Sequence, residues 1–145
     1  MARQKLEDVV DWLKTRLATN SDLDLIKYTH MDTKSFAVKR YGAHIYLPEE
    51  APYEDEHPYI GRKLKEVWNL GLDIIINKPF KLDESSITDA KGISYWKDTI
   101  EELLLHQTNS GVFLDTKWNF INTDPSNDRV VLKGRFECEI INNYD

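Results

Sequence analysis

The sequence contains a single cysteine, Cys138, so no disulfide can form within the chain. It has no run of lysines and arginines that could form a basic binding surface, and its formal net charge is −6. This charge argues against a nucleic-acid-binding surface, which needs clustered basic residues. The uninterrupted apolar stretches are too short for a signal peptide or a membrane span. We therefore expect the protein to stay in the cytosol, unless it leaves the cell within a larger particle.

The sequence also has no motif for catalysis, nucleotide binding or metal binding. GxGxxG, GxxxxGK[ST] and GxSxG do not occur. The histidines form no HExxH motif and no i, i+4 pair, and they are scattered over the chain at His30, His44, His57 and His106. The turn DPSND at 124–128 begins like a calcium loop, but arginine stands where that loop needs its glycine and its glutamate. We predict a protein that is not an enzyme and holds no metal or cofactor.

The clearest pattern is an alternation of apolar and polar residues, which occurs twice. It runs through 64–76 (LKEVWNLGLDIII) and again through 129–141 (RVVLKGRFECEII). Side chains of a strand point to alternate faces, so each stretch predicts a long strand with one apolar and one polar face. Two such strands predict an antiparallel sheet with one solvated face. Cys138 falls on the apolar face, where we expect it to be a small buried side chain.

The remaining elements follow from helical spacing and turn residues. Helices are predicted at 3–18 and 93–107, and strands at 23–30 and 34–47, joined near Asp32. A further strand at 112–123 forms a hairpin with the last strand through the DPSND turn. The resulting order is α-β-β-β-α-β-β in a single domain, 1–145. We predict an α+β fold with a mostly antiparallel sheet and two helices packed on one face.

Residues 49–61 (EEAPYEDEHPYIG) show no periodicity and predict a mobile acidic loop. A solvated loop does not need tyrosines, and tyrosine is enriched where proteins contact partners. Simple solvation and a partner contact both remain open. The residues that would make such a contact are Glu49, Glu50, Tyr53, Glu54, Asp55, Glu56 and Tyr59.

The length of the central strand suggests self-association. A strand over 63–77 spans about 50 Å, whereas a compact domain of this size measures about 40 Å across. We therefore expect the sheet to extend past its own core and to offer an edge to a second copy. A bulge at Gly71, which would bend the strand round the core, is the alternative.

The order of elements resembles that of the tail-terminator proteins of long-tailed bacteriophages, and of the neighbouring tail-completion or head–tail joining proteins. The matching stretches are KLEDVVDWLKTRL, WNLGLDIIINKP, ISYWKDTIEELLLH and DRVVLKGRFECEIINNYD. The resemblance implies a structural protein without catalytic residues. Its copies form a ring, generally a hexamer, at the head-proximal end of the tail. The ring stops polymerisation of the tail tube and joins the tail to the head connector.

This resemblance also implies partners and a location. The partners are other copies of the chain, the tail-tube or sheath protein, and a connector or neck protein, while DNA only passes through the lumen. The location is the virion tail or neck, after assembly in the host cytoplasm. The polar faces of the two long strands then become contact or lumen surface, with Lys63, Lys65, Asp73, Lys133, Arg135, Glu137 and Glu139 as the candidate residues.

Two other classes of function stay open. A cytosolic binding module, of the adaptor or immunity type, would use the loop at 49–61 to bind a basic partner. A small α+β enzyme or ligand carrier would need a pocket with convergent polar groups, for which the sequence offers no candidate set.

Overall fold

The computed structural model describes residues 6–29, 38, 40–47, 53–58, 63–77, 92–107, 113–126 and 129–143. The fold is α+β, as predicted, with two helices and a mostly antiparallel sheet. The elements in chain order are α1 (Leu6–Leu17), β1 (Leu25–Thr29), β2 (Tyr41–Tyr46), β3 (Tyr53–Pro58), β4 (Lys63–Asn77), α2 (Ile93–Leu104), β5 (Phe113–Pro125) and β6 (Arg129–Asn143). The predicted elements occur in the predicted order, and β3 is one strand more.

Strand β3 corrects the expectation of a loop at 49–61. Residues 53–58 pair antiparallel with the first half of β4, with an irregularity between Tyr53 and Glu56. The second half of β4 pairs with β2 on the same side. Without β3, the first half of β4 would have unpaired backbone groups along that side, and this need for partners explains a strand in a segment with no strand pattern. Residues 49–52 and 59–61 lie outside the described part of the chain.

The sheet has the order β1-β2-β4-β6-β5, with β3 beside β4. β4 and β6 are its two longest strands, and they pair antiparallel from Lys63↔Asn143 to Asn77↔Arg129. β1 and β2 pair in parallel, and parallel neighbours need a longer connection than a tight turn. Residues 30–37 and 39, between these two strands, are outside the described residues.

Both helices pack on the same face of the sheet. The ring of Trp12 in α1 lies 6.1 Å from that of Phe136 in β6, and the ring of Trp96 in α2 lies 5.0 Å from that of Tyr41 in β2. The helices contact each other where the Arg16 guanidinium donates to the carbonyl oxygen of Leu103. The apolar stripes of both helices and the apolar face of the sheet form a single core, which includes Cys138.

The ladder between β4 and β6 is interrupted at Leu72 and Asp73, although the register is the same on both sides. There is thus no bulge at Gly71, which corrects the alternative considered for this strand. The indole of Trp118 donates to the Leu72 carbonyl oxygen at 3.0 Å. It passes over Gly134, where a Cβ would lie 2.3 Å from the indole. Glycine at this position therefore lets a side chain satisfy a backbone group that the ladder leaves unpaired.

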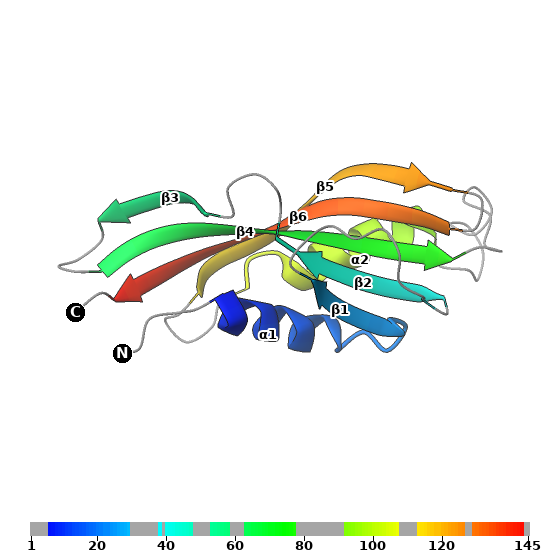
Figure 1. Cartoon of the computed structure of the whole chain (residues 1–145), viewed down its shortest axis with the longest axis horizontal. Coiled ribbons are helices and arrows are strands. Elements are labelled where there is room, and N and C mark those ends of the chain that lie inside the picture. Colours follow the sequence, from blue (N-terminus) through cyan, green and yellow to red (C-terminus); the bar gives the residue numbers. More distant parts are fainter. Residues whose placement is uncertain are drawn as a thin grey trace.

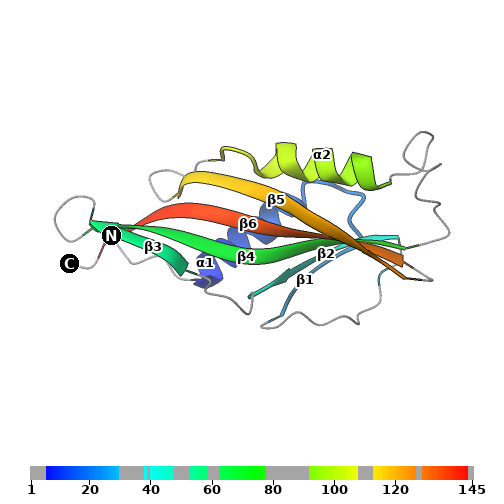
Figure 2. The ribbon, with the colours of Figure 1, turned by 90° about the horizontal axis from the view of Figure 1, so that it is seen from above.

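One end of the sheet extends past both helices. It consists of β3, the beginning of β4 and the end of β6, and α1 and α2 lie beside the remainder of the sheet (Figures 1 and 2). We call this three-stranded extension the β arm. Its presence agrees with the strand lengths, because β4 and β6 are longer than the layer of helices that covers them.

Candidate functional site: the helix-free face of the sheet

The polar residues predicted to form a contact surface come together on the face of the sheet opposite the helices. Arg135, Glu137 and Glu139 alternate along β6 with buried core residues. Their partners across β4 are Gly71, Asn69 and Val67, respectively. The structure thus places these three charged residues in one row on one face, as the alternation predicts.

Asp73 corrects part of this prediction. The alternation predicts that the Asp73 carboxylate is solvated, but Asp73 is only 2% exposed. One oxygen accepts from the Tyr46 hydroxyl at 3.1 Å, and the other pairs with the Lys133 ammonium at 3.2 Å. The backbone N–H of Gly134 approaches the same carboxylate at 3.4 Å. Asp73 and Lys133 therefore pair within one chain, and Asp73 in particular is not available to a neighbouring copy.

The aromatic ring of Tyr46 contributes to this burial. It lies against Gly71, where a Cβ would be 2.3 Å from the ring. The ring of buried His44 lies 4.9 Å from that of Tyr46, and its Nε2 is 2.7 Å from the Thr29 hydroxyl oxygen. A partly buried series of hydrogen bonds and one ring contact thus links β1, β2, β4 and β6. The alternation in β2 places His44 and Tyr46 on this face, but nothing in the sequence shows that they are covered.

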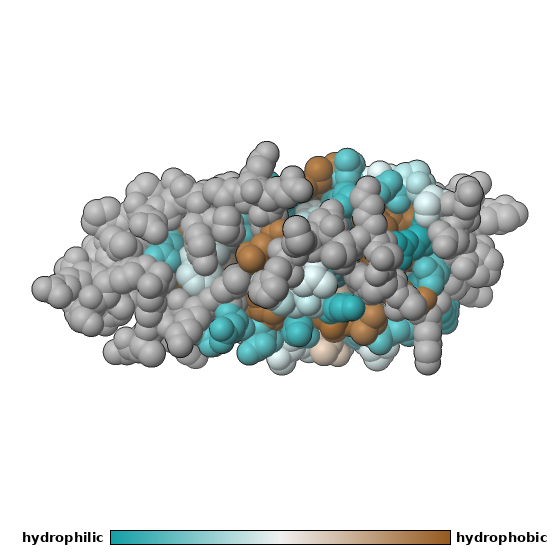
Figure 3. Space-filling view, viewed as in Figure 1, coloured by the Kyte–Doolittle hydropathy of each residue, from teal (hydrophilic) through white to brown (hydrophobic). Residues whose placement is uncertain are grey.

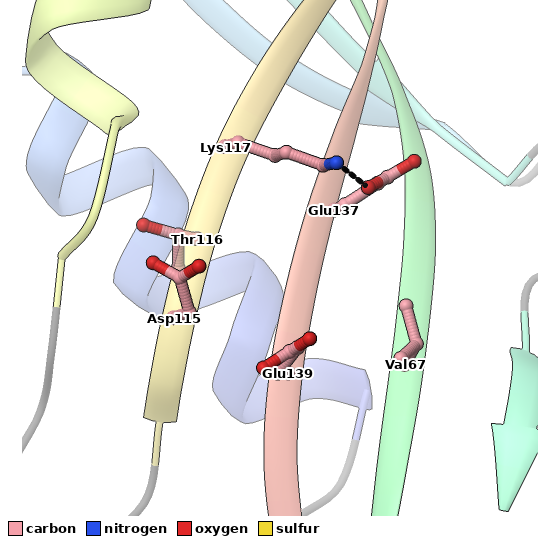
Figure 4. A pocket seen from close by; sticks show the side chains of 6 residues that line it. All are labelled: Val67, Asp115, Thr116, Lys117, Glu137 and Glu139. Carbon is pink, nitrogen blue, oxygen red and sulfur yellow. Dashed lines mark ion pairs between the residues drawn. The ribbon is translucent and has the colours of Figure 1, made fainter.

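A second cluster lies toward the β arm and is more open. The Lys117 ammonium is 3.1 Å from a Glu137 carboxylate oxygen, across β5 and β6 (Figure 4). This hydrogen bond and the negative charge of Glu137 raise the pKa of Lys117 above 10.5, with smaller contributions from Asp115 and Glu139. The cluster surrounds a hollow of about 80 Å³, lined by Val67, Asp115, Thr116, Lys117, Glu137 and Glu139.

The charges of this hollow suit contact with a cationic group. One ammonium faces three carboxylates, so the hollow has a surplus of negative charge that could accept a cationic side chain. Asp115 also contacts the exposed His106 ring at 2.8 Å. Within the described residues, no three His, Cys, Asp or Glu side chains are grouped so that they could hold a metal ion.

Asn69 also lies on this face, and no sequence pattern singled it out as a candidate residue. Its side chain is buried, and neither its amide nitrogen nor its amide oxygen has a hydrogen-bond partner among the described residues. Leaving such groups unsatisfied costs about 1–3 kcal/mol. Asn69 lies on β4 between the part that pairs with β3 and the part that pairs with β2. The first residue of β3 pairs with Trp68, and the last residue of β2 pairs with Gly71.

The acidic segment is placed by its backbone. Tyr53, Glu54, Asp55 and Glu56 lie in β3, while Glu49, Glu50 and Tyr59 are outside the described residues. Lys63 and Lys65 begin β4, where Lys65 pairs with His57 on one side and with Ile141 on the other. The structure therefore separates the candidate residues into a β arm with the acidic strand at its edge and a row of paired charges nearer the core.

Comparison with known proteins adds no relative, because no family model, curated protein or solved structure matches the chain. Among the described helices, none is long and apolar enough to cross a membrane.

Proposed function

We propose that this chain is a structural protein of a phage tail, which assembles as a ring of about six copies at the head-proximal end. The ring stops polymerisation of the tail tube and joins the tail to the head connector, and DNA passes through it without specific binding. The observation that carries this proposal is the β arm, which extends past both helices (Figure 1).

The β arm has two edges that lack a strand neighbour within the described chain. β3 pairs with β4 on one side only. On the other side of the arm, the pairing of β5 with β6 begins at Phe113↔Ile140, so the end of β6 has β4 as its neighbour and no other described strand. Unpaired edges are templates for another chain, and identical copies can cover them for each other in a closed ring.

The charges support the same proposal. Two ion pairs form inside one copy, Lys117 with Glu137 and Lys133 with Asp73, and their charges cancel. The chain as a whole keeps a formal net charge of −6. An acidic ring repels the DNA backbone, so the genome could pass through the lumen without adhering to it.

Electron microscopy of particles made without this protein is the direct test. We expect tails of irregular, excessive length or tails without heads, and their repair when the wild-type gene is supplied in trans. Tails of normal length that carry heads in the absence of the protein would overturn the proposal. Negative-stain images of the purified protein, alone and with tail tubes, would then show whether rings form in solution or on the tube end.

A second candidate function is a cytosolic binding module of the adaptor or immunity type. It is favoured by the position of the acidic segment, because β3 is an edge strand and edge strands accept extended segments of other proteins. A monomeric protein that binds a basic partner, loses it as salt is raised, and has no effect on tail length would support this function instead.

A further inference from the structure

The sheet edge opposite β3 is formed by β5, and part of it has no neighbouring strand among the described residues. The chain after α2 crosses this edge at Thr116, where the backbone N–H of His106 donates to the Thr116 carbonyl oxygen at 2.7 Å. The backbone N–H of Gln107 donates to the Thr116 hydroxyl at 2.9 Å. Beyond this crossing, residues 117–125 have β6 on one side and no described strand on the other (Figure 1).

This free edge carries an apolar side chain in contact with solvent. Ile121 is 59% exposed, and the other large exposed apolar side chain of the described residues, Leu105 at 47%, immediately precedes the crossing at Thr116. Ile121 is the extra residue of an irregularity, because Phe120 pairs with Gly134 whereas Asn122 already pairs with Lys133. A small hydrophobic area is visible at the edge of the molecule where β5 runs (Figure 3).

The sequence of the free edge, KWNFINTD at 117–124, is complementary to itself when two copies run antiparallel. With the centre between Phe120 and Ile121, Lys117 lies opposite Asp124 of the other copy, and Phe120 lies opposite Ile121. Asn119 lies opposite Asn122 in the same register. At each end of the contact, a lysine of one copy thus lies opposite an aspartate of the other, and the centre of the contact is apolar.

The faces agree with this register as well. Lys117 pairs with Glu137, and Asp124 pairs with Val131, so both belong to the row of alternate residues on the helix-free face. A twofold axis perpendicular to the sheet keeps each face on its own side, so the two charges meet on one face. The Asp124 side chain is exposed and forms no ion pair or hydrogen bond with the side chains of the described residues.

We propose that two copies of this chain associate through the free edges of β5, antiparallel about a twofold axis, with Lys117 of each copy paired to Asp124 of the other. The Lys117 ammonium has three donors, so it can bind Asp124 of the second copy while it keeps Glu137. The irregularity at Ile121 interrupts a regular ladder, and therefore the ion pairs and the apolar centre hold the contact.

The contact is short, since eight residues span about 27 Å. An interface of this size is at the low end for specific association, so we expect pairing at about 10–100 µM. The inference goes beyond the proposed function. It concerns the edge of the sheet opposite β3 and leaves the β arm uncovered, so it can succeed or fail whatever the role of the arm.

Sedimentation velocity over 10–300 µM tests the pairing with a charge reversal. Asp124→Lys places like charges opposite each other, and we expect the dissociation constant to rise at least about tenfold. Asp98→Lys is the matched control, because Asp98 is also exposed, lies on α2 and undergoes the same change of charge. We expect this control to pair like the wild type. Pairing by Asp124→Lys that equals the wild type, or a control that weakens as much, would overturn the inference.

The reciprocal exchange Lys117→Asp/Asp124→Lys tests the pair itself. We expect the double variant to regain at least half of the lost affinity, since opposite charges meet again. Thermal unfolding of each variant shows whether loss of the Lys117–Glu137 pair unfolds the chain. A folded double variant that pairs more weakly than Asp124→Lys would contradict the register.

Disulfide trapping provides a measurement that does not depend on charge. In the variant Asn119→Cys/Asn122→Cys, the new cysteines are opposite each other between copies, within disulfide reach. Within one extended strand they are about 10 Å apart and cannot bridge. Oxidation should give a covalent dimer, with buried Cys138 unaffected. A ladder of trimers and larger species would show a head-to-tail contact instead, and no cross-link at 300 µM would refute the contact.

Discussion

Replacing Asp73 should destabilise the protein more than any other change of a charged residue on the helix-free face. The carboxylate is buried and joins three strands, since it accepts from the Tyr46 hydroxyl of β2 and pairs with Lys133 of β6. It also lies where the ladder between β4 and β6 is interrupted, and there it accepts from the Gly134 N–H. At this interruption, the contacts of the Asp73 side chain take the place of the missing backbone pairing between β4 and β6.

The magnitude follows from burial. Removing one partner of a buried ion pair costs about 3–5 kcal/mol. The Lys133 side chain is 24% exposed, so water can solvate its ammonium after the change. We therefore expect Asp73→Ala to lower the free energy of unfolding by about 2–3 kcal/mol. Asp73→Asn keeps an acceptor for Tyr46 but loses the charge, and should cost about 1–2 kcal/mol.

Urea unfolding followed by tryptophan fluorescence measures these values, and Asp98→Ala on the exposed face of α2 is the control. The control should change stability by less than about 0.5 kcal/mol. A double-mutant cycle with Lys133→Met should give a coupling energy of about 1 kcal/mol or more. If Asp73→Ala unfolds at the same urea concentration as the control, the carboxylate does not hold the sheet together and the reasoning is wrong.

Three further changes test the interior. Asn69→Leu should raise the free energy of unfolding by about 1 kcal/mol, because it removes two buried polar atoms that have no partner in the described part of the chain; a loss of stability in urea would contradict this. Gly134→Ala should lower it by about 2 kcal/mol or more, since the new Cβ would meet the Trp118 indole, and wild-type stability would count against that packing. Burial raises the pKa of the Cys138 thiol above its ordinary 9.0, so the unfolded thiol ionises first and stability should fall as pH rises above that value. Cys138→Ala should lack this part of the decline in stability. Identical pH profiles of stability for the wild type and the variant would refute the explanation.

The long strands were predictable because their pattern is strong and local. The alternation around Trp68 places β4 at Lys63–Asn77, the range used to estimate its length. The end of α2 was predicted less well, since the helix was expected to reach residue 107 but ends at Leu104. His106 has a positive φ of 51° and donates its N–H to Thr116. A contact with β5 thus follows the helix directly and ends it before the expected residue 107.

Strand β3 and the parallel pair β1–β2 were beyond local reasoning. Residues 53–58 contain charges and a proline and do not alternate, and they form a strand because the adjacent side of β4 needs partners. The direction of β1 relative to β2 depends on the path of the chain between them, which short strands do not reveal. Non-local pairing, rather than propensity, decides both features.

The candidate site shows the same division. Alternation correctly places Asp73 and Glu137 on the face away from the helices, but it treats that face as solvated. Whether a position on it is covered depends on neighbouring strands, such as β2, whose Tyr46 ring lies against Gly71 and hydrogen-bonds Asp73. The sequence therefore identified the face, whereas the structure was needed to distinguish internal ion pairs from available charges.

The two proposed contacts together constrain the number of copies in an assembly. Pairing through β5 is isologous, so each copy is joined to one other copy, and the β arms remain to join these pairs. Arms that join pairs side by side give a single ring with an even number of copies, such as six from three pairs. If the arms instead join single copies into a ring, pairing through β5 links two such rings face to face. The total number of chains is again even. Native mass spectrometry of the assembled protein should therefore show an even number of chains, and an odd-numbered ring would mean that the arms alone close the assembly without the pairing of β5.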